Sequence, residues 1–252
     1  MTNKMIGIIP AAGSGVRARP YSYEIHKGLF AIDGKPNLAR NITIMKEDLG
    51  IEEVVIITGY MADEVMETLG DGSDMGVKIH YEHNQHLDRG WAWSVLLAKP
   101  YLAGRHACVM LSDEFYLGTN IADITTSGFA DHTVTVAVKT GADEEAIKRN
   151  FSVERNGARI VRLVENPVSV QNDILGMATF IAAPVVLDKL AEAYDGGRPS
   201  VEFVNFVDEL IRDGHSVSAF DMTGEYINLN DVSSLEDAND LAIRARLIAE
   251  EG

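Results

Sequence analysis

The sequence predicts an α/β fold, and three features of its 252 residues support this class. Short apolar runs alternate in the N-terminal half with segments whose apolar residues recur every three or four positions, as in strands and helices. The strand-like runs are apolar on both faces, which is typical of a parallel sheet covered by helices on each side. After Ser112 the pattern changes to alternating β-forming residues. We therefore expect a Rossmann-like three-layer αβα sandwich with a mostly parallel central sheet and a mixed C-terminal half.

In the N-terminal half, the predicted strands and helices follow one another in alternation. The strands are expected at Met5–Pro10, Val54–Thr58, Val77–Tyr81 and Ala107–Leu111, and the helices at Leu38–Leu49, Ala62–Leu69 and Gly90–Leu102. The first helix shows the period most clearly, because Leu38, Ile42, Met45 and Leu49 fall on one face.

The C-terminal half contains shorter strands and three helices. Strands are expected at Thr133–Lys139, Phe151–Glu154, Ile160–Val164, Met177–Ala182, Val217–Phe220 and Tyr226–Leu229, and helices at Val185–Tyr194, Val201–Asp213 and Ser233–Glu251. Asn156-Gly157 is a hairpin signal between two of the strands. Ser233 and Glu236 have the spacing of a capping box for the last helix. No repeat or linker interrupts the chain, so we expect one domain over residues 1–252.

Composition limits the classes of partner. The chain has 22 Lys and Arg against 38 Asp and Glu, a net charge of −16, which argues against a nucleic-acid-binding surface. Its single cysteine, Cys108, cannot form an intrachain disulfide and fits a cytoplasmic location. No signal peptide or apolar run long enough for a membrane span is found. No histidine has metal-ligand spacing with a Cys or carboxylate partner.

The segment Met5–Pro36 passes from an apolar strand into a Gly-rich turn followed by two basic residues. Gly13 and Gly15 allow the backbone to turn sharply and to approach a ligand, and amides in such a turn bind anions. Arg17 and Lys27 add two positive charges beside the turn, as a triphosphate needs. The spacing fits neither a Walker A loop nor a dinucleotide-binding fingerprint.

These residues resemble a known signature. Pro10-Ala11-Ala12-Gly13-Ser14-Gly15-Val16-Arg17, then Pro20 and Lys27, is similar to the opening motif of the nucleotidyltransferases that make nucleotide-activated sugars. The resemblance continues through Lys35-Pro36, Leu111-Ser112-Asp113, Glu165-Asn166-Pro167 and Tyr226–Asp231, and covers nearly the whole chain. It implies transfer of a nucleoside monophosphate from an NTP to a sugar 1-phosphate, with release of pyrophosphate.

The resemblance also implies roles for individual residues. Arg17 and Lys27 would be catalytic. The nucleotide would be bound by Ala11, Ala12, Gly13, Ser14, Gly15, Gln85, Gly90 and Ser112, in a half that covers about residues 1–125. The phosphorylated small-molecule acceptor would be bound by Glu165, Asn172 and Gly176, in a half that covers about residues 126–252. A homo-oligomer is compatible with this reading, whereas nucleic acid and membrane partners are not expected.

A magnesium site is expected at the end of the strand that precedes Asp113. Carboxyl ends of strands in an open parallel sheet face the ligand crevice, and a carboxylate there suits a hard cation. Asn230 is expected as the second Mg²⁺ ligand, with Asn228 and Asp231 as alternatives that spacing does not separate. Glu114, next to Asp113, is expected either to face solvent or to support the metal site from behind.

Departures from the sugar-specific pattern leave other functions open. His26 precedes Lys27 where the family usually has Pro. Asn150-Phe151 stands where sugar-specific members often have Tyr-Gly, whose Gly touches a sugar hydroxyl, and Asn166 replaces a Lys that commonly contacts the sugar phosphate. The alternative within the class is a cytidylyltransferase for phosphocholine, a phosphonate or inositol phosphate. Outside it, the alternatives are a catalytically silent nucleotide-binding regulatory protein and a metal-dependent glycosyltransferase.

Overall fold

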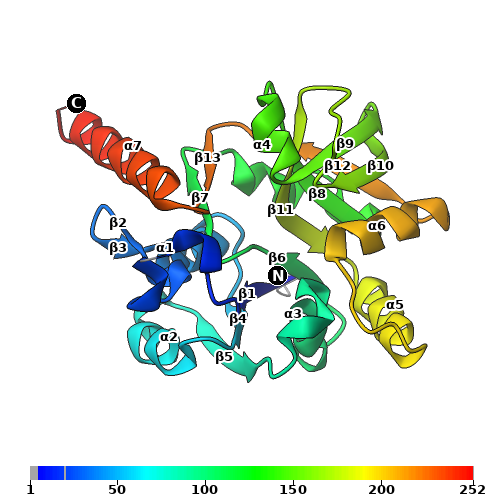
Figure 1. Ribbon diagram of the computed structural model, residues 1–252, viewed down its shortest axis with the longest axis horizontal. Helices are drawn as coiled ribbons and strands as arrows, with labels where there is room; N and C mark the ends of the chain where they lie inside the picture. The colour runs from blue at the N-terminus through cyan, green and yellow to red at the C-terminus, as the bar shows by residue number, and fades with distance from the viewer. Residues whose placement is uncertain (1–4, 20, 252) are drawn as a thin grey trace.

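One mixed sheet forms the centre of the molecule. The computed structural model describes residues 5–19 and 21–251, with the side chains of Arg17 and Glu251 outside that description. Within these residues the central sheet has nine strands in the order β5-β4-β1-β6-β11-β8-β12-β10-β9 (Figure 1). The sheet therefore runs without a break from the N-terminal to the C-terminal half of the sequence.

The N-terminal half is parallel, as the sequence predicts. It contains β1 (Met5–Ala11), β4 (Glu53–Thr58), β5 (Lys78–His83) and β6 (His106–Val109). Strand β1 lies between β4 and β6, and all pairs in this group are parallel. Their carboxyl ends consequently lie along one edge.

The C-terminal half changes the direction of the sheet. Its strands are β8 (Val134–Thr140), β9 (Phe151–Asn156), β10 (Arg159–Glu165), β11 (Ile174–Ala182) and β12 (Val217–Asp221). Strand β11 is antiparallel to both β6 and β8, β12 is parallel to β8, and β10 is antiparallel to β12 and β9. The expectation of a mostly parallel sheet is therefore wrong for the sheet as a whole, because β11 is antiparallel to both its neighbours in the sheet and β9 and β10 form a hairpin.

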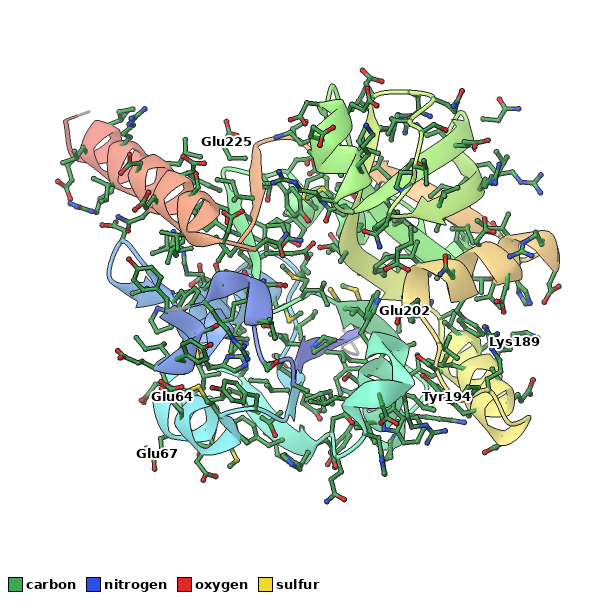
Figure 2. The ribbon with its side chains drawn as sticks, in the orientation of Figure 1. Glu64, Glu67, Lys189, Tyr194, Glu202 and Glu225 are labelled. Atoms are coloured by element: carbon green, nitrogen blue, oxygen red, sulfur yellow. The ribbon has the colours of Figure 1, made fainter. Side chains whose placement is uncertain are left out.

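Helices cover both faces of the sheet, and each face has its own apolar core. On one face, α1 (Asn37–Glu47) and α2 (Ala62–Leu69) pack with Met45, Val65 and Ile56 in the core. On the other face, α3 (Trp91–Leu97), α5 (Pro184–Asp195) and α6 (Phe203–Arg212) pack over Ile8 and Val55. Tyr194 of α5, labelled in Figure 2, packs against Trp93 of α3 with ring centroids 5.0 Å apart.

Two small strand pairs and the last helix lie outside the sheet. β7 (Glu114–Leu117) is antiparallel to β13 (Glu225–Asn228), and β2 (Ala31–Ile32) to β3 (Lys35–Pro36). The last helix, α7 (Val232–Glu251), extends to the C-terminal end (Figure 1). A third apolar cluster, which includes Ile32, Phe115 and Ala242, joins these parts. The remaining helices are α4 (Glu144–Lys148) and 3₁₀ turns at Val16–Ala18, Tyr21–Tyr23, Lys27–Leu29, Ser73–Met75, Leu87–Arg89, Lys99–Tyr101, Ile121–Thr126 and Phe129–Asp131.

Two predicted helix boundaries differ from the structure for identifiable reasons. The helix expected at Gly90–Leu102 ends at Leu97, because Pro100 lacks the N–H that an α-helix would need there and a 3₁₀ turn follows. At α7 the capping pair is Asp231 and Ser234, not Ser233 and Glu236: each side chain accepts a hydrogen bond from the other's backbone N–H. Among residues 5–19 and 21–251, no helix is long and apolar enough to cross a membrane.

Candidate active site

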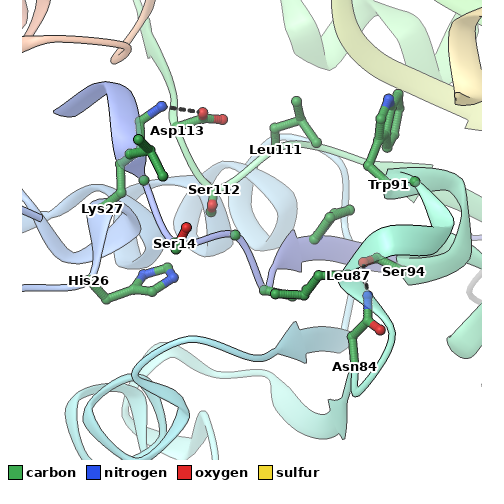
Figure 3. A pocket seen from close by; sticks show the side chains of 16 residues that line it. Ser14, His26, Lys27, Asn84, Leu87, Trp91, Ser94, Leu111, Ser112 and Asp113 are labelled. Carbon is green, nitrogen blue, oxygen red and sulfur yellow. Dashed lines mark hydrogen bonds and ion pairs between the residues drawn. The ribbon is translucent and has the colours of Figure 1, made fainter. Parts of the chain in front are cut away.

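A cavity of about 470 Å³ opens at the carboxyl ends of β1 and β6 (Figure 3). Six of the residues predicted to bind a nucleotide line it: Ala12, Gly13, Ser14, Gly15, Gly90 and Ser112. Lys27, predicted to be catalytic, and Asp113, predicted to bind the metal, also lie in its wall. The cavity thus collects residues from the Gly-rich turn, the start of α3 and the end of β6.

The Gly-rich turn has the geometry that its glycines allow. Gly15 adopts a left-handed conformation (φ 59°), and a Cβ there would approach Ser22 and Lys27 at 3.1 and 3.3 Å. Gly13 has no heavy atom within 4 Å of its Cβ position, so its side is open to a ligand. The turn is held by Ser22, whose hydroxyl donates to the Gly15 carbonyl at 2.7 Å.

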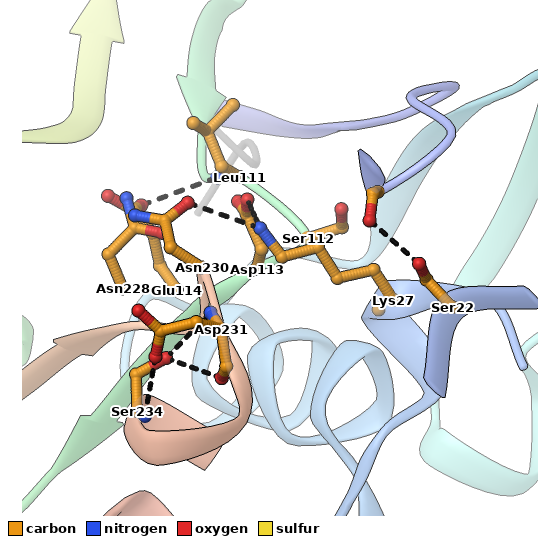
Figure 4. A network of polar contacts seen from close by, with 12 residues as sticks. Ser22, Lys27, Leu111, Ser112, Asp113, Glu114, Asn228, Asn230, Asp231 and Ser234 are labelled. Carbon is orange, nitrogen blue, oxygen red and sulfur yellow. Dashed lines mark hydrogen bonds and ion pairs between the residues drawn. The ribbon is translucent and has the colours of Figure 1, made fainter. Parts of the chain in front are cut away.

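Lys27 joins the turn to the predicted metal ligands. Its ammonium lies 2.5 Å from an Asp113 carboxylate oxygen and 3.4 Å from Asn230 Oδ1 (Figure 4). Only 8% of Lys27 is exposed. A buried ammonium needs such a partner, because an unpaired charge would lose its hydration without compensation. Three chain segments that are far apart in sequence therefore meet at one cation.

His26 is a functional-site neighbour that the sequence did not identify. Its backbone N–H donates to Glu64 at 2.8 Å, Nε2 lies 2.9 Å from the Ala11 carbonyl and Nδ1 accepts from the Gly28 N–H. The imidazole is therefore neutral with its proton on Nε2, and burial lowers its pKa. His26 fixes the Lys27 turn to the end of β1. The only sign of this residue in the sequence is that it stands where the family usually has Pro.

The oxygens of Asp113 and Asn230 fit a magnesium ion. Both point to the same ammonium, so they converge on a position of positive charge. Mg²⁺ accepts few protein ligands and completes its shell with water and substrate phosphates. Within the described chain, no group of three or more His, Cys, Asp or Glu could hold a metal, so water and substrate phosphates would supply the further oxygens of such an ion.

The two alternatives to Asn230 have other surroundings. Asp231 caps α7 by accepting a hydrogen bond from the Ser234 N–H. This hydrogen bond is the largest cause of the lowered pKa of Asp231, and the positive charges of Arg149 and Lys27 lower the pKa further. Asn228 donates to Asn150 Oδ1 at 3.2 Å, while its own Oδ1 is buried without a hydrogen-bond partner among the described residues. Of the three, Asn230 is the residue whose side chain contacts Lys27.

Glu114 is buried behind Asp113, so the expectation that it could face solvent is wrong. Its carboxylate accepts from the hydroxyls of Tyr116 at 2.5 Å and Tyr226 at 2.6 Å, and from the Ala178 N–H at 2.9 Å. Burial raises the pKa of Glu114 to about 7, against the opposing effect of these donors. The carboxylate links β7, β13 and β11, and thereby ties the Asp113 segment to the strand that precedes Asn230.

Two asparagines of α1 hold the backbone on either side of Asp113. The Asn37 amide donates to the carbonyls of Ser112 and Glu114 at 3.0 and 2.9 Å. The Asn41 amide donates to those of Leu111 and Glu114 at 3.1 and 3.0 Å. Both asparagines are completely buried. This segment therefore has fixed hydrogen-bond donors on the helix that follows the Lys27 turn.

The part of the cavity expected to read the base differs from the prediction. Gln85 is exposed and does not line the cavity, whereas its neighbour Asn84 does and donates to Ser94 Oγ at 3.0 Å. Gly90 has φ 80°, and a Cβ there would lie 2.4 Å from the Val201 carbonyl oxygen. Ala11 lies behind the wall, where its carbonyl contacts His26. Side chains one position apart on a bend face different ways, and sequence spacing does not resolve this.

The three residues predicted to bind the acceptor do not line this cavity. Asn172 donates to the Val153 carbonyl and accepts from the Ile174 N–H, so its side chain holds the start of β11 in place. Gly176 accommodates Phe151, whose ring would lie 1.8 Å from a Cβ at that position. Glu165 has a buried Oε2 without a partner among the described residues. Burial, and then the charge of Glu202, raise its pKa to about 7.

Arg17, the other predicted catalytic residue, can be followed only through its backbone. It lies in the 3₁₀ turn Val16–Ala18, and its side chain lies outside the described residues. Its role therefore stays a prediction.

Comparison with known proteins shows which family the chain belongs to. The model of the nucleotidyl transferase family matches residues 6–244. A glucose-1-phosphate thymidylyltransferase of Streptomyces griseus is 25% identical over 95% of this chain, which spans 66% of that relative's length. The UTP–glucose-1-phosphate uridylyltransferase AglF of Haloferax volcanii is 25% identical, with 87% of this chain and 89% of that protein covered. The solved inositol-1-phosphate CTP transferase from T. maritima shares the fold, with a TM-score of 0.75, 20% identity and 94% of each chain covered. The match to the family model spans nearly the whole chain, and the chain therefore belongs to the nucleotidyl transferase family.

Proposed function

We propose that this protein transfers a nucleoside monophosphate from an NTP to a sugar 1-phosphate and releases pyrophosphate, with Mg²⁺ as the cofactor. The observation that carries the proposal is the meeting of Lys27, Asp113 and Asn230 in the wall of a cavity that begins with a Gly-rich turn. The relatives named as sugar-1-phosphate nucleotidyltransferases support the same reaction.

The chemistry needs positioning and neutralisation of charge. An oxygen of the acceptor's phosphate forms a bond to the α-phosphorus while the bond from that phosphorus to the β-phosphate oxygen breaks. Pyrophosphate leaves with the electron pair of the broken bond, so no residue has to form a covalent intermediate. The open side of Gly13 and the amides of its turn would receive the triphosphate, and Lys27 would neutralise charge at the reacting phosphate.

Asp113 and Asn230 are the residues that would hold Mg²⁺. When bound, Mg²⁺ supplies positive charge to the phosphate oxygens. Lys27 contacts both oxygens in the described structure, so its ammonium must turn from them toward the phosphates as substrates enter. A four-carbon side chain permits this movement.

A cytidylyltransferase acting on a non-sugar phosphomonoester is the second candidate. It is supported by Asn150 and Asn166, which depart from the sugar-specific pattern. Asn166 lies at a left-handed φ of 45°, and its N–H donates to the Asn150 carbonyl at 2.7 Å, so the two departures are neighbours. The phosphate acceptor therefore has to be determined separately from the reaction type.

A matrix of substrates tests the proposal. The purified protein is incubated with Mg²⁺, each of CTP, UTP, dTTP, GTP and ATP, and a panel of sugar 1-phosphates, inositol 1-phosphate and phosphocholine. Pyrophosphate is measured, and the product is identified by mass spectrometry. We expect release with a sugar 1-phosphate. Release only with a non-sugar phosphomonoester would select the second candidate, and no release with any pair would refute both.

A further inference from the structure

Lys27 has to move its ammonium while its backbone stays in place. In the described structure the ammonium contacts Asp113 and Asn230, whereas the proposed reaction needs it at the phosphates of the nucleotide. Rotation of the side chain brings the ammonium to a defined place only when the Lys27 Cα keeps its position relative to the Gly-rich turn. The groups that hold the backbone of Lys27 therefore matter for the reaction.

His26, the residue before Lys27, is hydrogen-bonded to three segments of the chain. Its Nε2–H donates to the Ala11 carbonyl at the end of β1 over 2.9 Å, and its Nδ1 accepts from the Gly28 N–H over 3.1 Å. Its backbone N–H donates to Glu64 Oε2 on α2 at 2.8 Å. His26 is only 1% exposed, so water does not compete for these bonds. The imidazole thus joins the strand that leads into the Gly-rich turn to the residue that follows Lys27.

Close packing on both sides of Lys27 adds to these hydrogen bonds. A Cβ at Gly28 would lie 2.8 Å from the Leu38 side chain and 3.1 Å from Ser112 Cβ. A Cβ at Gly15 would lie 3.3 Å from the Cβ of Lys27 itself. The backbone of Lys27 therefore lies against the Gly-rich turn on one side, and its neighbour Gly28 lies against α1 and the end of β6 on the other.

The two hydrogen bonds of the His26 ring require a neutral imidazole. A proton on Nδ1 would remove the acceptor for the Gly28 N–H and would place a second positive charge beside Lys27. Burial is the largest cause of the lowered pKa of His26. The charge of Lys27 lowers this pKa as well, while the negative charges of Glu64 and Asp113 oppose the shift. The surroundings therefore favour the form of the ring that makes both bonds.

The backbone angle of His26 shows what the imidazole adds. Its φ is −57°, close to the value of about −65° that a proline ring imposes. Proline at this position could therefore keep the same backbone angle. It would lack the N–H that bonds to Glu64 and both ring nitrogens, which bond to Ala11 and Gly28. Histidine fixes the position of this turn relative to β1, whereas proline would fix only its local angle.

We propose that His26 is a positioning residue, whose imidazole holds the backbone of Lys27 at the end of β1 so that the ammonium reaches the phosphates of a nucleotide in the Gly-rich turn. The assignment rests on the proposed transferase function, which gives Lys27 its role. His26 does not contact the reacting atoms itself, so its effect has to pass through Lys27.

Equilibrium binding of inorganic tripolyphosphate in the presence of Mg²⁺ tests this assignment without depending on turnover or on the choice of base. Isothermal titration calorimetry compares the wild type with His26→Asn, Lys27→Ala and the double variant. Lys27→Ala should weaken binding at least about 10-fold, as for loss of a charge-assisted hydrogen bond. His26→Asn should weaken it at least about 3-fold, because residues that act together show coupling of this size. In the Lys27→Ala background, His26→Asn should have no further effect.

Two other variants complete the comparison. The amide of His26→Asn can still accept from the Gly28 N–H but is too short to reach the Ala11 carbonyl, which the longer amide of His26→Gln can reach. His26→Gln should therefore lose less affinity, and it takes the place of His26→Asn if that variant lacks the circular dichroism spectrum of the folded protein. His80→Asn is the matched control, because it removes a partly buried imidazole that lies 3.3 Å from Glu53 and does not line the cavity. It should bind tripolyphosphate as the wild type does.

The outcomes separate this proposal from the transferase function. Equal losses on His26→Asn in both backgrounds, or a loss in neither, would overturn the proposal, since His26 would not act through Lys27. Wild-type protein that binds tripolyphosphate no better than Lys27→Ala would overturn it as well. Coupled losses without transfer to any acceptor would refute the transferase function and leave the positioning of Lys27 at a phosphate site established. With an active substrate pair, His26→Asn should lower kcat about 10-fold, as for a misplaced group, and an unchanged kcat would overturn its role in the reaction.

Discussion

The side-chain amide of Asn37 on α1 donates a 2.9 Å hydrogen bond to the backbone carbonyl of Glu114, 77 positions later in the chain. Asn41 donates to the same carbonyl at 3.0 Å. The helix that follows the Lys27 turn thus fixes the segment that contains Asp113. This connection joins the segment of Asp113 to the helix that follows Lys27.

Removal of these amides should affect catalysis through Asp113. We expect Asn37→Ala and Asn41→Ala each to destabilise the fold by about 1–3 kcal/mol, because buried carbonyls lose their donors. We also expect a lower kcat and a higher Mg²⁺ concentration for half-maximal rate. Asn120→Ala is the control, since its amide likewise bonds to backbone groups, at Asp221 and Thr223, away from the cavity. A loss of stability with unchanged Mg²⁺ dependence would limit both asparagines to a structural role.

Lys27→Ala should slow the reaction at saturating substrates. If Lys27 stabilises charge that develops at the phosphates, its loss should lower kcat by about 10²-fold or more. Lys35→Ala provides the comparison, because Lys35 donates to Thr43 on the surface and does not line the cavity. Equal turnover of Lys27→Ala and the wild type would remove Lys27 from the mechanism.

Glu165 should make the stability of the fold depend on pH. Its pKa is raised from 4.5 to about 7 in the folded protein, so the folded state binds its proton more tightly than the unfolded state does. Stability should therefore decrease as pH rises from about 4.5 to about 7. Since the side chain is only partly buried, we expect Glu165→Gln to be more stable than the wild type by about 1 kcal/mol at pH 7.5, after allowance for solvent screening.

Urea unfolding of Glu165→Gln and the wild type at pH 4.5, 6 and 7.5 measures this difference. The advantage of the variant should be near zero at pH 4.5 and should grow with pH. Glu67→Gln on the exposed side of α2 should show no such trend. A constant offset across the three pH values would contradict the titration of Glu165.

Gly176→Ala should destabilise the junction of β9 and β11. The added Cβ would lie 1.8 Å from the Phe151 ring, and such overpacking costs about 1–3 kcal/mol. In the double variant Gly176→Ala/Phe151→Leu, the smaller side chain should relieve part of the clash. The destabilisation measured by urea unfolding should then be smaller than the sum of the two single changes. Additive effects would show that the two residues do not interact.

The sequence predicts the parallel half of the fold well, because each buried strand there has a helix next to it with a clear 3.6-residue period. Strand β1 and helix α2 agree with their predicted ranges to within a residue. The sequence does not predict strand β7, because Glu114 is a charged residue at its start. In the structure this carboxylate is buried and accepts hydrogen bonds from two tyrosine hydroxyls. The mixed order of the C-terminal strands depends on long-range pairing, which local periodicity does not contain.

The candidate site shows the same division. Residues of the Gly-rich turn and Asp113 could be located from the sequence because they follow strands whose ends share one edge. Gln85 and Asn84 could not be distinguished, since their directions depend on the bend after β5. Gly176 was predicted to touch an acceptor, but the structure assigns its small size to the Phe151 ring. A glycine in a sequence does not reveal which neighbour requires it.

The pairing of β7 with β13 has a consequence for biosynthesis. It brings Asp113 together with Asn230, and 230 − 113 = 117 positions separate these two residues. At typical elongation rates the ribosome needs roughly 6–23 s to add that length. A nascent chain could therefore complete the Gly-rich turn well before it has both oxygens of the cation site. Truncated translation products would contain the phosphate-binding turn without the partner strand.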